Sequence, residues 1–172
     1  MRIRTTILGL LVLPSVGATQ GTPSYVVVDP SQLVQYWKSK DRNDRLELPK
    51  SVVHSRTEGC VAVGYSIEAD GKPANLVVLR AGYGEHVDKQ IAAEVEQRTV
   101  QYLADMRYEA ARSNPGHKAI YTYSFTSFTP YSSSMAKTIV DQRSDFVKAH
   151  CVILDFPAAV ARGDLMRKSS SR

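Results

Sequence analysis

Residues 59–79 read GCVAVGYSIEADGKPANLVVL, and this stretch decides the fold. Two runs rich in apolar residues flank the dipeptide Asp70-Gly71. In the first run, apolar side chains fall on alternate positions, which is typical of a strand with one buried face. Gly71 suits the turn because glycine adopts a positive φ without steric cost. We therefore expect a β-hairpin whose buried face carries Val61, Val63, Tyr65 and Ile67.

A helix and a third strand are expected after the hairpin. Residues 118–128 alternate strictly, which predicts a strand with Tyr121, Tyr123 and Phe125 on its core face and Thr122, Ser124 and Thr126 facing out. Between residues 85 and 108, apolar residues recur at helical spacing, as on one side of an amphipathic helix. That stripe consists of Val87, Ile91, Val95, Tyr102 and Met106.

The predicted fold class is therefore α+β, with a small three-stranded antiparallel sheet packed on one long amphipathic helix. Short helical segments extend this unit at both ends. The length of 172 residues fits one domain with appendages. We divide the chain into a leader at 1–18, an N-terminal extension with a short helix at 19–47, the central domain at 48–130 and a C-terminal helical appendage with a disordered tail at 131–172.

The first residues carry the pattern of a secretory signal peptide. Arg2 and Arg4 precede an apolar run at 6–13, and small residues at 16–18 offer a cleavage site. A retained membrane anchor is the alternative, but a span needs about 20 apolar residues and this run is much shorter. We expect export to the periplasm and no membrane span in the mature chain.

The two extensions carry further local signals. Tyr25–Val28 is an extended apolar segment, and Asp29-Pro30 begins a short helix. In the C-terminal appendage, a helix is expected from about Met135 to Ala149, followed by a short apolar run at 152–154.

Composition argues against a nucleic-acid partner. The formal charge is +5, and loss of Arg2 and Arg4 with the leader lowers it to +3. The basic residues form no long run apart from the C-terminal end of the chain, where a solvated tail is expected.

The two cysteines, Cys60 and Cys151, fit an exported chain with one disulfide. Two separate buried thiols or an intermolecular bridge are the alternatives. An internal bridge would close a loop of about 90 residues and stabilise the fold by roughly 4 kcal/mol. It would also force the C-terminal appendage to fold back over the first strand of the hairpin.

The sequence offers no catalytic constellation and no metal-ligand spacing, so we expect a non-enzymatic protein without a cofactor. The four histidines occur singly and are expected to be surface or structural residues. An exported enzyme whose site is assembled from isolated residues such as His54, His117 and Glu109 is the least favoured reading. The remaining histidines are His86 and His150.

Four short motifs in a fixed order resemble the C-terminal domain of the TonB energy-transducer family. They lie at Leu48–Val53, Glu58–Val63, Asp70–Asn75 and Met106–Ala110, and the resemblance spans Leu48 to Phe128. Two positions depart from the family pattern, since Met106 stands where an aromatic is usual and Ala110 where proline is usual. A transducer also keeps an uncleaved membrane helix and a long proline-rich spacer, and neither is expected here.

The resemblance implies a binding mode. In TonB-like domains the last strand of the sheet keeps an open edge, which pairs with an extended peptide of an outer-membrane receptor by β-augmentation. In this sequence the corresponding edge runs from Lys118 to Phe128. The implied peptide-binding residues are Lys118, Ile120, Thr122, Ser124, Thr126 and Phe128. Proline at Ser124 is expected to remove an edge donor and abolish binding.

A second hypothesis keeps this fold without a role in energy transduction. The protein would then be a soluble adaptor, a decoy or an assembly factor of the Gram-negative envelope, with another envelope protein as partner. The oligomeric state stays open, and pairing of two copies into a homodimer through the open edge suits this class of sheet.

Overall fold

The computed structural model describes residues 25–40, 46–50, 52, 58–85, 87–128, 135–136, 145–163 and 165. The predicted signal peptide lies outside these residues, as do His54 and His86. Within the described part of the chain, none of the helices has both the length and the apolar character needed to cross a membrane.

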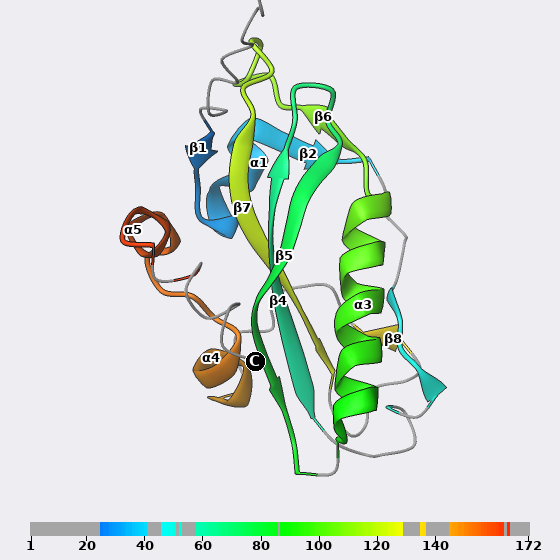
Figure 1. Cartoon of the computed structure of the whole chain (residues 1–172). Coiled ribbons are helices and arrows are strands. Elements are labelled where there is room, and N and C mark those ends of the chain that lie inside the picture. Colours follow the sequence, from blue (N-terminus) through cyan, green and yellow to red (C-terminus); the bar gives the residue numbers. More distant parts are fainter. Residues whose placement is uncertain are drawn as a thin grey trace, which may run out of the picture.

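A four-stranded sheet forms the centre of the molecule (Figure 1). Its strand order is β1 (Val26–Val27), β7 (Ile120–Phe128), β4 (Gly59–Ile67) and β5 (Pro73–Tyr83). The three long strands are antiparallel to their neighbours, whereas β1 adds to β7 in parallel. The structure thus confirms an α+β fold with an antiparallel sheet. The sheet has a fourth strand because the extended segment at 25–28 joins it.

The β4–β5 turn has the chemistry that the Asp70-Gly71 pair predicts. Gly71 has φ +79°, and the Glu68 carbonyl accepts from its N–H at 2.9 Å. The Gly71 carbonyl in turn accepts from the Tyr108 N–H at 3.0 Å, so the turn is packed against the chain after the long helix. A Cβ at position 71 would collide with the Tyr108 carbonyl oxygen, so both the dihedral and the space favour glycine here.

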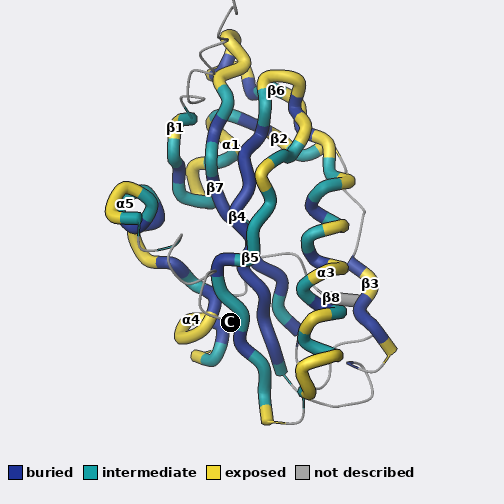
Figure 2. The backbone as a smooth tube through the Cα atoms, in the orientation of Figure 1, coloured by how far each residue is buried: buried dark blue, intermediate teal, exposed yellow. Residues whose placement is uncertain are grey.

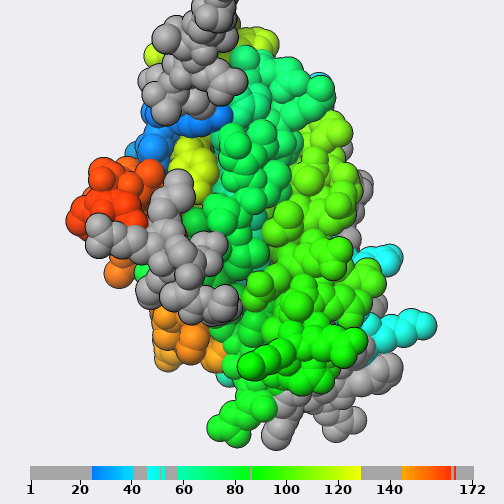
Figure 3. Space-filling model, in the orientation of Figure 1, coloured from blue at the N-terminus to red at the C-terminus, as the bar shows by residue number. Residues whose placement is uncertain are grey.

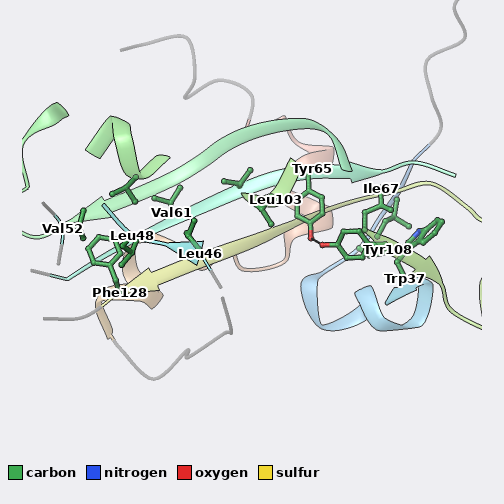
Figure 4. Packing of buried hydrophobic residues seen from close by; sticks show 14 residues of the cluster. Trp37, Leu46, Leu48, Val52, Val61, Tyr65, Ile67, Leu103, Tyr108 and Phe128 are labelled. Atoms are coloured by element: carbon green, nitrogen blue, oxygen red, sulfur yellow. Dashed lines mark hydrogen bonds between the residues drawn. The ribbon is translucent and has the colours of Figure 1, made fainter. Parts of the chain in front are cut away.

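The long helix α3 (Lys89–Asp105) covers one face of the sheet. It begins at Asp88, whose carboxylate accepts from the Ile91 N–H at 2.8 Å, and it ends where Met106 turns to extended backbone. The buried side chains of the helix are Val95, Thr99 and Leu103. Leu103 lies in one core with the buried strand residues Val61, Tyr65 and Ile67 (Figure 4).

Three of the four sequence motifs, those at 48–53, 58–63 and 106–110, contribute side chains to this helix-side core. Leu48 and Val52 pack near Phe128 and Val61 at one end of the core (Figure 4). At the other end, the hydroxyls of Tyr65 and Tyr108 share a 3.0 Å hydrogen bond. Segments about 60 residues apart in the sequence therefore depend on one another for burial.

The opposite face of the sheet is also buried, so the expectation of a hairpin with one buried face is wrong. All nine residues of β4 are buried (Figure 2). The second face is covered by α4 (Asp145–His150), α5 (Phe156–Ala161) and the segment between them. We refer to residues 145–163 as the C-terminal cover.

A disulfide joins Cys60 of β4 to Cys151, with a Cα–Cα distance of 6.1 Å. The internal bridge expected from the sequence is therefore confirmed, and the C-terminal cover folds back over the first hairpin strand. Both cysteines are fully buried. The shared core on this face includes Ala62, Leu79, Tyr123, Phe125, Val147 and Phe156.

Shorter elements complete the fold. The short helix of the N-terminal extension is present as η1 (Pro30–Gln32) and α1 (Leu33–Tyr36). Two small antiparallel ladders join β2 (Trp37–Ser39) to β6 (Tyr108–Ala110) and β3 (Leu46–Glu47) to β8 (Met135–Ala136). The helix expected from Met135 is wrong at its start, because residues 135–136 pair as a strand. Its last turns form α4, and residues 137–144 lie outside the described residues.

The disulfide yields the first prediction. Replacing Cys60 and Cys151 together by alanine should lower the free energy of unfolding by about 2–5 kcal/mol, because the unfolded chain loses a 91-residue cross-link. Urea unfolding of the oxidised parent and the double variant measures this difference. Reductant should destabilise the parent and leave the double variant unchanged. Equal midpoints for the oxidised parent and the double variant would contradict a stabilising bridge.

A second prediction concerns alkaline pH. Burial, followed by the neighbouring Tyr108, raises the pKa of Tyr65 well above its ordinary value. Its contribution to stability is full below about pH 10 and is lost as pH rises further, since only the unfolded chain then ionises readily. Tyr65→Phe should cost about 1 kcal/mol at pH 8 and reduce the loss of stability above pH 10. Chemical unfolding at pH 8 and above pH 10 measures this loss. If Tyr65 plays no part, the parent and Tyr65→Phe would lose the same free energy of unfolding between the two pH values.

Candidate strand-docking edge

The long strand β7 presents a regular backbone to its outer side. It pairs with β4 over nine consecutive residues, from Ile120 opposite Ile67 to Phe128 opposite Gly59, without a shift in register. A strand held this regularly repeats its main-chain groups on the other edge with the same spacing. That spacing is what an added strand needs.

Part of this edge already carries an added strand. The Val26 N–H donates to the Ala119 carbonyl at 3.2 Å, and the Val28 N–H donates to the Tyr121 carbonyl at 3.0 Å. The Thr122 hydroxyl also donates to the Val28 carbonyl at 3.0 Å. Residues 119–122 thus bind β1 in parallel, although more than 90 residues separate the two segments.

The bonds to β1 identify the groups that face outward along the rest of β7. Because main-chain groups alternate between the two sides of a strand, odd-numbered residues point away from β4. We call the main-chain N–H and C=O groups of Tyr123, Phe125 and Ser127 the open edge. In the described part of the chain, only β1 and β4 pair with β7, and β1 stops short of these three residues.

The six residues predicted to bind the peptide lie on β7 or just before it, but not at the open edge. The even-numbered residues of β7 turn their main-chain groups to β4, and their side chains share the face of Ile120 and Phe128, toward α3. A proline at Ser124 would therefore remove a bond to β4. Ile120, Thr122, Thr126 and Phe128 are buried, Ser124 is half-buried, and Lys118 is exposed before the strand begins.

The odd-numbered side chains of β7 face the C-terminal cover. Tyr123 and Phe125 are buried there, as their predicted core position requires, but they pack away from α3. The outward orientation expected for Thr122 and Thr126 is wrong, because the sheet has two covered faces and both threonines are buried on the helix side. The alternation in the sequence separated the odd-numbered from the even-numbered residues of β7. It could not show that a second layer, the C-terminal cover, buries the other face of the sheet.

Tyr123 fixes the C-terminal cover beside the open edge. Its hydroxyl donates to the Ile153 carbonyl at 3.2 Å and accepts from the Ile153 N–H at 3.1 Å. The ring of Phe156 lies 4.9 Å from that of Tyr123 and 5.6 Å from that of Tyr121. Burial raises the pKa of both tyrosine hydroxyls, so both stay neutral at physiological pH.

The strand at the other side of the sheet, β5, is a poorer docking edge. It has 11 residues, and among the described strands it pairs with β4 alone. Its pairing with β4 shifts register twice, between Ala62 and Val63 and between Gly64 and Ser66. Asn75 adds a left-handed residue with φ +54°. Such bulges twist an edge and disfavour further pairing.

The described residues hold no group of three or more histidine, cysteine, aspartate or glutamate side chains that could bind a metal. A pocket of about 360 Å³ lies near Asn114 and Lys118. Asn114 uses its side chain within this loop, accepting from the Lys118 N–H at 2.9 Å and donating to the Tyr36 carbonyl at 3.2 Å. This arrangement is that of a stabilised turn.

Comparison with solved structures gives a structural likeness. No family model matches the sequence. No curated protein matches it either. Among solved structures, the chain is similar to the solution NMR structure of Pseudomonas aeruginosa TonB CTD, with 20% sequence identity and a TM-score of 0.39. The match covers 56% of this chain and 89% of that chain.

The cover over the open edge yields a third prediction. Tyr123→Phe should lower the free energy of unfolding by about 1–3 kcal/mol, because the buried Ile153 N–H and carbonyl both lose their partner. Tyr121→Phe is the matched control, since the structure shows no hydrogen bond from the Tyr121 hydroxyl to the described residues. Thermal or urea unfolding compares the two variants. Equal losses would mean that the Tyr123 bonds do not hold the cover.

Proposed function

We propose that this chain is a non-enzymatic binding module of the TonB C-terminal type, which docks an extended peptide along the outer edge of β7. The observation that carries the proposal is the parallel addition of β1 to β7, in which the Val26 and Val28 N–H groups donate to carbonyls of residues 119 and 121. The same strand thus accepts an extended segment from elsewhere in the chain. The four motifs that resemble the family support the same function, and three of them contribute to the core that Ile120 and Phe128 of β7 share.

The open edge sets the form of the proposed complex. An added strand would lie about 4.8 Å from β7 and exchange main-chain bonds with Tyr123, Phe125 and Ser127. Most of the affinity would come from these bonds, and side chains at alternate positions would supply selectivity. Ser127 is the half-buried member of the three, so its side chain tolerates change best.

For the partner, we propose the extended segment of an outer-membrane receptor. This choice rests on the sequence resemblance and on export to the periplasm, for which the signal at 1–18 is the support. One observation favours the second hypothesis, a soluble envelope adaptor or decoy: β1 already occupies the start of the edge. Recovery of receptors from an envelope extract would favour transport, and recovery of other envelope proteins alone would favour the adaptor.

The fourth prediction tests docking directly. Ser127→Pro removes an outward-facing N–H and should weaken binding of receptor-derived extended peptides at least about tenfold. Ser127→Ala keeps that N–H and should bind like the parent. NMR titration of the oxidised protein, with the amides of residues 118–128 followed, gives both the affinity and the place of binding.

Both variants should keep the fold, because proline is tolerated where a strand N–H faces outward. Chemical shifts of α3 would confirm this. Equal affinities for the two variants, or shifts confined to other parts of the protein, would rule out strand addition at the open edge.

A further inference from the structure

The segment Tyr25–Asp29 resembles a docked ligand more than a permanent strand of the sheet. It binds β7 through two main-chain N–H groups, and only Val26 and Val27 count as a strand. Val26 is 36% exposed, whereas Val28 is 3% exposed and reaches the helix-side core. An extended segment that buries side chains at alternate positions is the usual form of a β-augmentation ligand.

Contacts at both ends hold this segment in place. At its start, the Tyr25 hydroxyl donates to Glu68 at 2.9 Å and accepts from Asn75 at 3.1 Å. At its end, the Asp29 carboxylate accepts from the Phe156 N–H at 3.3 Å. Hydrogen bonds of the Tyr25 and Asp29 side chains thus strengthen the short main-chain pairing with β7.

The C-terminal cover clamps the segment on its second side. Phe156 lies between the Asp29 contact and the rings of Tyr121 and Tyr123. Figure 3 shows the red end of the cover next to the blue N-terminal residues, with the yellow surface of β7 beside both. The disulfide at Cys151 fixes the cover itself to β4. The segment therefore contacts both β7 and a covalently tethered layer.

We propose that residues 25–29 are an intramolecular pseudo-ligand, which exchanges with the external peptide at the β7 edge. The inference rests on the proposed function, because it takes β7 to be the docking strand. It also specifies the partner: an extended segment that runs parallel to β7 and carries β-branched aliphatic residues, one of which fills the place of Val28. The covered start of the edge then becomes part of the docking site.

Exchange has a quantitative consequence. A tethered segment acts at an effective concentration in the millimolar range or above. The apparent affinity for an external peptide equals its intrinsic affinity multiplied by the fraction of time that the edge is free. Any substitution that weakens the tethered segment alone should therefore strengthen external binding.

Two proline substitutions test the bond between the tethered segment and β7, one as the test variant and one as its control. Val26→Pro removes the N–H that donates to Ala119. Val27→Pro is the matched control, because the N–H of Val27 lies between two inward-facing donors and points away from β7. Both variants replace a valine by proline in the same extended segment, and only the first removes a bond to the edge.

The fifth prediction uses the peptide acetyl-Tyr-Val-Val-Val-Asp-Pro-amide, which has the sequence of residues 25–30. Fluorescence anisotropy on the full oxidised chain should show weak binding to the parent and to Val27→Pro. Binding to Val26→Pro should be about five- to tenfold tighter, as loss of one main-chain bond implies. Amide hydrogen exchange at Val28 should accelerate in Val26→Pro and in the peptide-bound parent.

Equal affinities for the two proline variants, together with a Val28 amide that stays protected, would overturn the pseudo-ligand. Receptor-derived peptides that bind at residues 123–127 without exposing the Val28 amide would also overturn it and would leave the proposed function intact. If the hexapeptide binds Val26→Pro and receptor-derived peptides bind neither variant, edge exchange stands and the proposed receptor partner falls.

Discussion

The burial of β4 on both faces is the constraint on which the rest of the structure depends. A strand of nine fully buried residues needs a hydrogen-bonding neighbour on each side and a layer above and below it. The neighbours are β5 and β7, and the layers are α3 and the C-terminal cover. Small residues make the second layer possible: Ala62 and Gly64 leave room for side chains from the cover and from neighbouring strands.

The same constraint leaves the two outer edges of the sheet, on β5 and β7, as its exposed main-chain groups. With both faces closed by other layers, the sheet presents main-chain groups only at its flanks within the described residues. The two long flanks differ in regularity, since β5 is bulged twice and β7 is continuous. The edge that keeps an even spacing is the one that the chain itself has used, through β1.

Local patterns predicted the elements well. Period-two alternation and the Asp70-Gly71 turn gave the hairpin, the apolar stripe gave the long helix, and Cys60 and Cys151 gave the bridge. The first two signals lie within single elements. The third depends on cysteine, which forms disulfides in exported proteins. Predicted bounds were too wide at the helix, where Asp88 caps the first turn and Met106 is already extended.

Features that depend on distant segments could not be predicted in the same way. The sequence predicts Tyr25–Val28 as an extended segment. No local pattern in it indicates that it pairs with β7, more than 90 residues away. The even-numbered residues of β7 were predicted to form the edge, whereas the odd-numbered residues turn their main-chain groups away from β4. Alternation defines two sets of residues, and only the bonds to β1 show which main-chain groups face outward.

The disulfide between residues 60 and 151 also bears on the order in which the chain folds. Contacts this distant in sequence raise the contact order and slow folding, because a long loop must close before the contact stabilises it. Until residues 145–161 are available, the apolar side chains of Ala62, Tyr123 and Phe125 have no cover. A growing chain would pass through a stage in which this apolar surface is exposed, and a chaperone that binds apolar segments would be of most use at that stage.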